Sequence, residues 1–487
     1  MNAPPVPAER PLVQRALAGH AAIGLLVGAL LYIVLLTGSL SVVHERLLRW
    51  ENVDAPRVEA LSPIKVQRAL AQAWRTPGKS PSKTLYIALP NAASGRAVVY
   101  NDDGAHLLDQ DGAIAAEAAN PWTEFLLALH EHLNLPATFG LILVGLLGVM
   151  MAALSITGIV AHPRIARDAF LLRARGHRQL AQADWHNRIG TWTLPFALAI
   201  ALTGAFFGLG SVGAGLIARA YHGGDVSRVY SPVFGDFVGH DPRPAPLADV
   251  ATALRTMHNR FPDAEPGFVT VVGPGTEGQR VIVLAEMPRR LIYGENFLFD
   301  AAGNYHGTVG LSDGRLGQQA AASAYKLHFG DFGGWPVELL YLALGLAVTA
   351  IAGTGMSLWL QKRHKKGHDC ARLEAFWSVI VWGTPMLLAL AYWGTRILPA
   401  ALTPVLTFWS GLALAVAAGL IWPAALERAR TRRAAAAIMV ATGIAHALIM
   451  DVELTALTID AALVGIGTLT WLPRAPVRHR HPTHAMV

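Results

Sequence analysis

The sequence predicts a mainly α-helical membrane protein with about eight spans and two small α+β domains outside the bilayer. Of its 487 residues, 53% are hydrophobic and only 15% are charged, which excludes an ordinary soluble enzyme. Two long polar segments interrupt the apolar sequence. Apolar runs long enough to cross a bilayer occur at about residues 20–43, 138–161, 189–211, 336–360, 376–397, 401–423, 434–452 and 456–473.

Loop charge predicts the orientation of these spans. Half of the Lys and Arg residues, 20 of 40, lie in five segments that hold only 6 of the 33 acidic residues. Cationic loops stay on the cytoplasmic side, so both termini are expected in the cytoplasm and the two long loops outside. The sequence gives little support to nucleic-acid binding, because the basic residues flank spans and do not form one soluble face. The five segments are residues 1–19, 162–188, 361–375, 424–433 and 473–487.

The order of polar and apolar segments predicts a duplicated front region followed by four additional spans. The first span is long enough to be a retained anchor and lacks a clear cleavage site for a signal peptidase. The expected parts are a first span at 12–43, an external domain at 44–137, two spans with a basic loop at 138–211, a second external domain at 212–335, a fourth span at 336–360, four further spans at 376–473 and a cytoplasmic tail at 474–487.

Each external segment is expected to pack one helix on a small antiparallel sheet. In the first, residues 62–75 have helical spacing, and strand-like runs follow at 84–89, 97–100 and 106–109. The second repeats this order, with a helical pattern at 247–261 followed by the runs FVTVV, VIVLA and NFLFD. A helix covering a sheet is the simplest arrangement that buries both apolar faces.

Histidines recur at the beginning of two outward spans. His20 and His186 each precede a Thr-Gly pair, and 18 residues separate each histidine from its glycine, Gly38 or Gly204. At 1.5 Å per helical residue this distance is roughly 27 Å, close to the thickness of the hydrocarbon layer. Both histidines are therefore expected at the cytoplasmic face, and both glycines at the periplasmic face.

Two more histidines precede the inward spans. His130 lies 28 residues before Gly158, and His328 lies 27 residues before Gly355. Both are expected at the periplasmic face, with their glycines at the cytoplasmic face. His132 is an alternative to His130, and His44 is a third candidate at that face; a boundary histidine can also be a capping or snorkelling residue.

Paired imidazoles at both membrane faces suit two haems, each held by two axial histidines. Filling both axial positions favours electron transfer over oxygen activation. No C-x-x-C-H motif occurs, so the haems would be non-covalent and b-type. Cys370 is the single cysteine, which excludes an internal disulfide and a four-thiolate iron–sulfur cluster. The predicted iron ligands are His20 with His186 and His130 with His328, and the predicted haem-packing glycines are Gly38, Gly158, Gly204 and Gly355, although ordinary helix packing explains the glycines equally well.

The four last spans contain little that predicts chemistry. His446 is the only histidine among them, and it is either a functional group or a packed polar residue. Asp451 and Asp460 are candidates for proton relay, but a short external turn explains Asp451 equally well.

Several short motifs in residues 12–365 resemble the PepSY-associated transmembrane family, which includes inner-membrane siderophore and ferric reductases. The resemblance implies a four-helix core with two b-type haems and two PepSY-like domains in the periplasm. The motifs are His20 with Gly24, Gly28 and Leu36-Thr37-Gly38; Leu129-His130; Ser155 with Thr157-Gly158; Trp185-His186 with Gly190 and Leu202-Thr203-Gly204; and Leu327-His328-Phe329-Gly330.

The expected function is electron transfer across the bacterial inner membrane to a periplasmic acceptor. By resemblance, the protein would be a ferric-siderophore reductase, an oxidoreductase that reduces a ferric siderophore or other ferric chelate and releases Fe(II). The electron donor, cytoplasmic or quinol, is not identifiable, and no residue cluster identifies the chelate site. Two alternatives remain: a non-enzymatic module that regulates a periplasmic protease or partner, and a quinone-linked haem oxidoreductase.

Overall fold

The eight expected spans are present in the computed structural model, which describes residues 11–75, 81–162, 165, 178–235, 241–399, 403–450 and 453–472. Within that part of the chain, eight helices are long and apolar enough to cross a membrane, so this is a multi-pass membrane protein. They are α1 (Leu12–Ser41), α5 (Ala137–Ala161), α7 (Arg178–Tyr221), α11 (Gly334–Lys365), the continuous α12 and α13 (Ala371–Ile397), α14 (Pro404–Ile421), α15 (Arg428–Ile449) and α16 (Leu454–Trp471).

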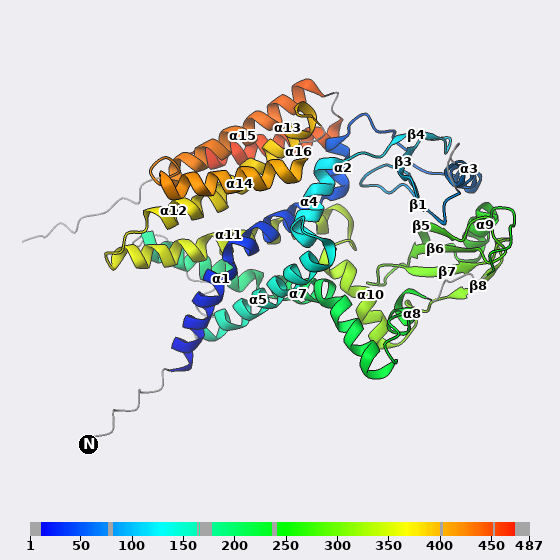
Figure 1. The fold of residues 1–487 in the computed structure, drawn as a ribbon, viewed down its shortest axis with the longest axis horizontal. Coiled ribbons are helices and arrows are strands. Elements are labelled where there is room, and N and C mark those ends of the chain that lie inside the picture. Colours follow the sequence, from blue (N-terminus) through cyan, green and yellow to red (C-terminus); the bar gives the residue numbers. More distant parts are fainter. Residues whose placement is uncertain are drawn as a thin grey trace, which may run out of the picture.

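The first four spanning helices form a closed ring. Helix α1 packs against α5 and α11, and α7 packs against the same two helices from the other side. Small residues allow the close approach of α5 and α7, since a Cβ on Gly145 would lie 2.9 Å from the carbonyl carbon of Gly208. The four C-terminal spanning helices pack beside this ring as a second unit (Figure 1).

Helix α7 is much longer than the expected span at 189–211. Its 44 residues extend roughly 66 Å at 1.5 Å per residue, about twice the hydrocarbon thickness. Apolar content limits only the part inside the bilayer, whereas the helix continues wherever neighbouring elements support it. In its C-terminal half, α7 packs against α8 (Ser227–Phe234) and α10 (Leu316–Phe329), and these helices form an arm beside the sheet (Figure 1).

The two external segments form one sheet, so the expectation of two separate small domains is not confirmed. The strand order is β4-β3-β2-β1-β5-β6-β7-β8, and all pairs are antiparallel. The two halves meet where β1 pairs with β5, from Thr84 opposite Val272 to Ala88 opposite Phe268. The strands are β1 (Thr84–Ala88), β2 (Val98–Asn101), β3 (Gly104–Leu108), β4 (Ile114–Glu117), β5 (Glu265–Val272), β6 (Arg280–Glu286), β7 (Glu295–Phe299) and β8 (Tyr305–Thr308).

Both expected external helices cover this one sheet. Helices α3 (Pro63–Trp74) and α9 (Val250–Arg260) contact each other, and their apolar side chains share one core with alternate residues of β1 and β5. Joining the halves also satisfies backbone groups that would otherwise be exposed at two sheet edges.

Short helices that the sequence pattern did not predict position the outer histidines. Helix α4 (Pro121–His132) carries His130, and α10 carries His328. The N-terminus of α4 is capped by the buried carboxylate of Glu51, which accepts hydrogen bonds at 2.8 Å from the backbone N–H groups of both Trp122 and Thr123. Glu51 ends helix α2 (His44–Glu51), which follows α1 directly.

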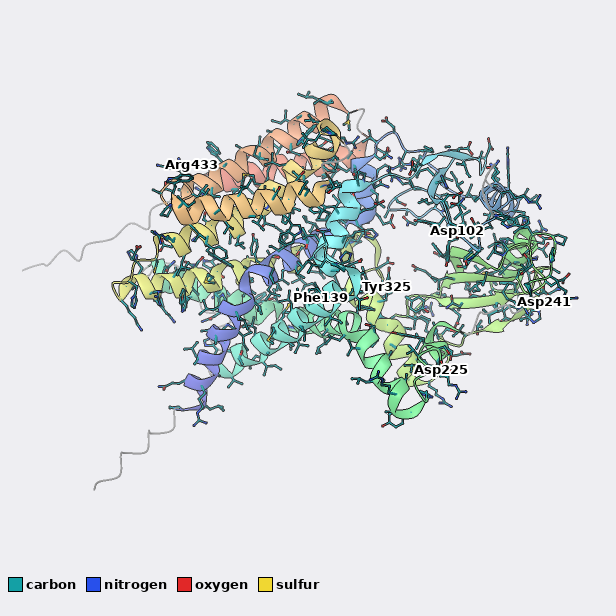
Figure 2. All side chains as sticks on the ribbon, in the orientation of Figure 1. Asp102, Phe139, Asp225, Asp241, Tyr325 and Arg433 are labelled. Atoms are coloured by element: carbon teal, nitrogen blue, oxygen red, sulfur yellow. The ribbon has the colours of Figure 1, made fainter. Side chains whose placement is uncertain are left out.

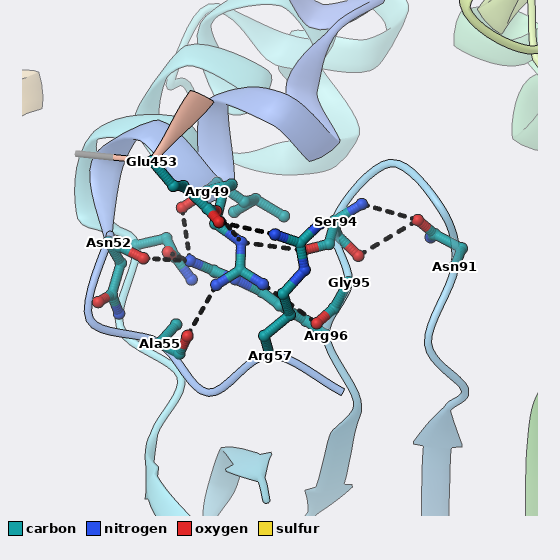
Figure 3. Close-up of polar contacts among 11 residues, drawn as sticks. Arg49, Asn52, Ala55, Arg57, Asn91, Ser94, Gly95, Arg96 and Glu453 are labelled. Atoms are coloured by element: carbon teal, nitrogen blue, oxygen red, sulfur yellow. Dashed lines mark hydrogen bonds and ion pairs between the residues drawn. The ribbon is translucent and has the colours of Figure 1, made fainter. Parts of the chain in front are cut away.

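Two buried arginines join the sheet to the helices at this end (Figure 3). Arg49 donates to Glu453 at 3.0 Å and to the Ala55 carbonyl at 2.7 Å, and Arg96 donates to the carbonyls of Leu48 and Asn52, both at 2.7 Å. Burial and the neighbouring Arg49 charge lower the pKa of Arg96 to about 10. These contacts hold α2, and through it α4, against the sheet.

Figure 2 shows Arg433 near one end of the molecule, and Asp102, Asp225 and Asp241 toward the other, around the sheet and the α7 arm. Loop charge predicts that the end with Arg433 faces the cytoplasm. The placement of the termini in the cytoplasm remains a prediction, and the tail at 474–487 lies outside the described residues.

Candidate functional site

The structure brings His20 of α1 and His186 of α7 together. Their ring centres are 6.4 Å apart, and the ring planes are nearly perpendicular, at 86°. The two residues are far apart in sequence, but α1 and α7 lie on opposite sides of the four-helix ring, so their side chains meet inside it. We call these two residues the inner pair.

The structure also brings His130 of α4 and His328 of α10 together. Their ring centres are 6.1 Å apart, and the ring planes are inclined by only 24°. Burial lowers the pKa of His130, and burial together with the neighbouring His130 lowers the pKa of His328 to about 3, so both imidazoles are neutral at physiological pH. We call these two residues the outer pair.

Hydrogen bonds identify the protonated nitrogen in one histidine of each pair. Nδ1 of His20 lies 3.0 Å from the carbonyl oxygen of Leu154, and Nδ1 of His130 lies 2.9 Å from that of Val34. A carbonyl oxygen can only accept, so in each ring Nδ1 carries the proton and donates it. The lone pair of each neutral imidazole is therefore on Nε2.

Threonine hydroxyls have the same role for the other two histidines. Nδ1 of His186 lies 3.0 Å from Oγ1 of Thr354, and Nδ1 of His328 lies 2.9 Å from Oγ1 of Thr203. Each hydroxyl has a single proton, which it donates to a carbonyl of its own helix at 3.0 Å or 2.7 Å. It must therefore accept from the histidine, which again leaves the lone pair on Nε2.

The four predicted glycines lie directly against the four histidines. A Cβ on Gly38 would lie 2.4 Å from Cε1 of His130, and one on Gly204 would lie 3.1 Å from Cε1 of His328. The corresponding distances are 3.5 Å from Gly158 to His20 and 3.4 Å from Gly355 to His186. In this structure the glycines thus make room for the imidazoles themselves, and their predicted contact with a macrocycle remains a prediction.

These pairs have the donor set and spacing that a bis-imidazole metal site needs. If each Nε2 bound one iron in line at about 2 Å, the two ring centres would lie about 6 Å apart, close to the separations found in both pairs. An Nδ1–H held by a carbonyl or hydroxyl is also the usual arrangement around a metal-binding histidine. Each pair could therefore supply two imidazole nitrogens to one metal centre.

The two alternative histidines have other surroundings. His132 is on the same helix as His130, but it is His130 whose ring lies against His328, and Nδ1 of His132 is buried without a hydrogen-bond partner. His44 donates from Nδ1 to the carbonyl of Ser41 at 3.1 Å, and its Nε2 lies 3.6 Å from Glu45. The geometry therefore favours His130 over both alternatives.

The sequence did not decide the roles of His446 and Asp460, and the structure joins the two side chains in one buried hydrogen-bond network. Nδ1 of His446 lies 2.9 Å from Oδ2 of Asp460, and Nε2 of His446 donates to the carbonyl of Trp50 at 3.0 Å. The indole N–H of Trp50 donates to Oδ1 of Asp460 at 2.8 Å. Both histidine nitrogens are thus engaged, which indicates a structural connection between α2, α15 and α16. Asp451 lies outside the described residues.

Comparisons with known proteins cover the four-helix ring and the sheet. Residues 17–362 match the family described as PepSY-associated TM region. The chain is also similar to an uncharacterised protein of Pseudomonas aeruginosa, with 30% identity over 332 residues that cover 62% of this chain and 79% of the relative. The matched family region contains both histidine pairs and ends before the C-terminal spanning unit.

Proposed function

Since this chain belongs to the PepSY-associated TM region family, we propose that it transfers electrons across the bacterial inner membrane through two b-type haems. Its terminal acceptor would be a ferric siderophore or another ferric chelate in the periplasm. The protein would then be a ferric-chelate reductase.

The observation that carries this proposal is the repeated geometry of the inner and outer pairs. In the described part of the chain no cluster of three or more His, Cys, Asp or Glu side chains is suited to a metal ion. Two imidazoles alone are too few ligands for a bare transition metal, whereas a porphyrin supplies the remaining nitrogens around the iron. Paired histidines without further ligands therefore support haem over a simple metal site.

The separation of the two pairs along α1 supports an electron path between the two membrane faces. His20 of the inner pair and Gly38, which touches the outer pair, are on the same helix and 18 residues apart, or roughly 27 Å along its axis. When bound, the haems would supply reversible one-electron chemistry. The chain's own part would be to hold each haem through the Nε2 atoms of two histidines, which would leave no ligand position for oxygen, and to keep each ring oriented through its Nδ1–H.

Reduction of a ferric chelate has a simple chemical purpose. Fe(III) is a hard cation that oxygen ligands hold tightly, and adding one electron weakens that hold and releases Fe(II). The eight-stranded sheet and the α7 arm lie at the end of the molecule that carries the outer pair, where a periplasmic acceptor or partner would bind.

Haem content per chain tests the proposal. We expect two b-type haems in the purified protein, one haem after His186→Ala and one after His328→Ala, with distinct spectra for the two variants. His258→Ala, on the exposed side of α9, is the matched control and should keep both. A colourless wild-type protein would contradict the proposal and favour the non-enzymatic alternative.

The acceptor is tested separately. Dithionite-reduced protein should be reoxidised rapidly by ferric citrate under anaerobic conditions, as followed by the loss of the haem α band. Reoxidation by a quinone but not by the ferric chelate would favour the alternative of a quinone-linked oxidoreductase that delivers electrons to the membrane pool.

A further inference from the structure

The fifth span contains a π-helical turn at Val379–Gly383. Pro385 follows it and has no backbone N–H, so the carbonyl of Val381 has no partner four residues later. The hydroxyl of Tyr32 from α1 donates to this carbonyl at 2.9 Å. Wide turns of this kind are frequent at functional sites because they move one side chain out of the regular helical register.

The side chain in this turn that lacks a partner is Trp382. Its indole Nε1 is buried and has no hydrogen-bond partner, which is costly for a donor. It lines a groove of about 200 Å³ in the C-terminal spanning unit. The groove is formed by Trp382, Arg432, Ile466, Leu469, Thr470 and Leu472.

The groove combines apolar side chains with residues that carry N–H donors. Three aliphatic side chains provide an apolar surface, while the Trp382 indole and the Arg432 guanidinium provide N–H donors. Arg432 also donates from Nη1 to the carbonyls of Thr470 and Leu472, so its position is held at the end of α16. An oxygen-bearing ring with an apolar body matches this lining.

The groove and the inner pair are expected at the same end of the molecule. Arg432 is in the first turns of α15, and Leu472 directly follows α16, so the groove is at the predicted cytoplasmic end. Val381, next to Trp382, packs on α11, where a Cβ on Gly353 would lie 3.9 Å from its side chain. Thr354, the next residue, accepts from His186. The fifth span and α11 thus lie between the groove and the inner pair.

We propose that this groove binds the headgroup of a membrane quinol, which donates electrons to the inner pair; the inference rests on the proposed di-haem function. The oxygens of the headgroup would accept from Trp382 and Arg432, and its isoprenoid chain would remain in lipid. Oxidation of one quinol yields one quinone, two protons and two electrons. The haems that the inner and outer pairs would hold would take up one electron each, and the protons would pass to water at the predicted cytoplasmic end.

Anaerobic stopped-flow measurements with duroquinol test this assignment. Haem reduction should be at least tenfold slower in Trp382→Phe, which keeps an aromatic ring but removes the N–H, and in Arg432→Gln. Trp422→Phe, an exposed indole (63%) at the end of α14 outside the groove, is the matched control and should reduce at the wild-type rate. Reduction by dithionite should be equal in all four proteins, which shows that the haems are intact.

Equilibrium binding of duroquinone to oxidised protein, measured by calorimetry, provides a readout that does not depend on turnover. Binding should weaken at least tenfold in Trp382→Phe and remain unchanged in Trp422→Phe. Equal binding and equal reduction rates in all variants would overturn the quinol site, as would occupancy by cardiolipin that duroquinone does not displace. The proposed function fails separately, if the protein has no haem or its haems are not reoxidised by ferric citrate.

Discussion

At the residue scale, the threonine that precedes each glycine has a definite role. Thr203 and Thr354 accept hydrogen bonds directly from His328 and His186. The other two threonines donate to the carbonyls that receive the remaining histidine protons, at 3.2 Å to Val34 and 3.1 Å to Leu154. Each of the four Thr-Gly pairs thus lies against one histidine from another helix. The repeated dipeptide was visible in the sequence, but the hydroxyl's role was not.

Thr203→Val tests that role. Valine keeps the volume but removes the acceptor for Nδ1 of His328, so the outer haem should bind about 10- to 100-fold more weakly while the inner haem is retained. Haem titration followed by absorbance measures the change. Thr191→Val on the same helix is the control, because that hydroxyl donates to the carbonyl of Asn187. Equal affinity in both variants would show that the hydroxyl does not support the ligand.

Gly38→Ala tests the close contact with the outer pair. The added methyl group would lie 2.4 Å from Cε1 of His130, so the ring must move and the outer haem should be lost or bound at reduced occupancy. Pyridine haemochrome assays give the haem content per chain. Gly19→Ala is on the same helix with no atom within 4 Å of the new Cβ, and it should retain both haems. Full occupancy in Gly38→Ala would contradict the predicted ligand geometry.

At the scale of elements, the buried network of His446, Asp460 and Trp50 connects the C-terminal unit to α2. All three residues are at most 2% exposed. Nε2 of His446 must donate its proton to the Trp50 carbonyl. The contact between Nδ1 of His446 and the Asp460 carboxylate then needs a second proton, which these two groups share. Such a pair is a stable connection only while both members are present.

His446→Ala tests this connection. It leaves the Asp460 carboxylate buried with only the Trp50 N–H, which should lower the free energy of unfolding by about 3–5 kcal/mol. Thermal unfolding in detergent, with both haem spectra recorded before heating, separates stability from haem binding. His364→Ala, at the exposed end of α11, should unfold like the wild type. Unchanged stability in His446→Ala would mean that the network does not join the two helical units.

At the scale of the whole molecule, loop charge and the position of the sheet predict one orientation in the bilayer. The sheet and the outer pair would face the periplasm, and the groove near Trp382 would lie at the cytoplasmic end. The proposed direction of electron flow, from quinol to periplasmic chelate, depends on this orientation.

Cysteine labelling in intact cells tests the orientation. In a Cys370→Ser background, Asp111→Cys on the sheet side should react with a membrane-impermeant maleimide in cells whose outer membrane is permeable to it. Lys366→Cys, after α11, should react only once the inner membrane is opened. The reverse labelling pattern would place the sheet in the cytoplasm and exclude a periplasmic acceptor site.

Local composition was sufficient to predict the eight spans, most strands and the four paired histidines. Hydrophobic length, loop charge and residue spacing act on each segment independently of its neighbours, so they can be read along one chain. The helices α4 and α10 were missed because tertiary contacts, such as the Glu51 cap, support them more than any periodic pattern.

Other features depended on the folded chain. Pairing of β1 with β5 merged two expected domains into one sheet. Contacts between residues more than a hundred positions apart placed Thr203 against His328 and Asp460 against Trp50. These interactions join backbone edges and single polar atoms of distant segments. Neither composition nor periodicity specifies which distant partner satisfies such a group; the packing of the helices and strands does.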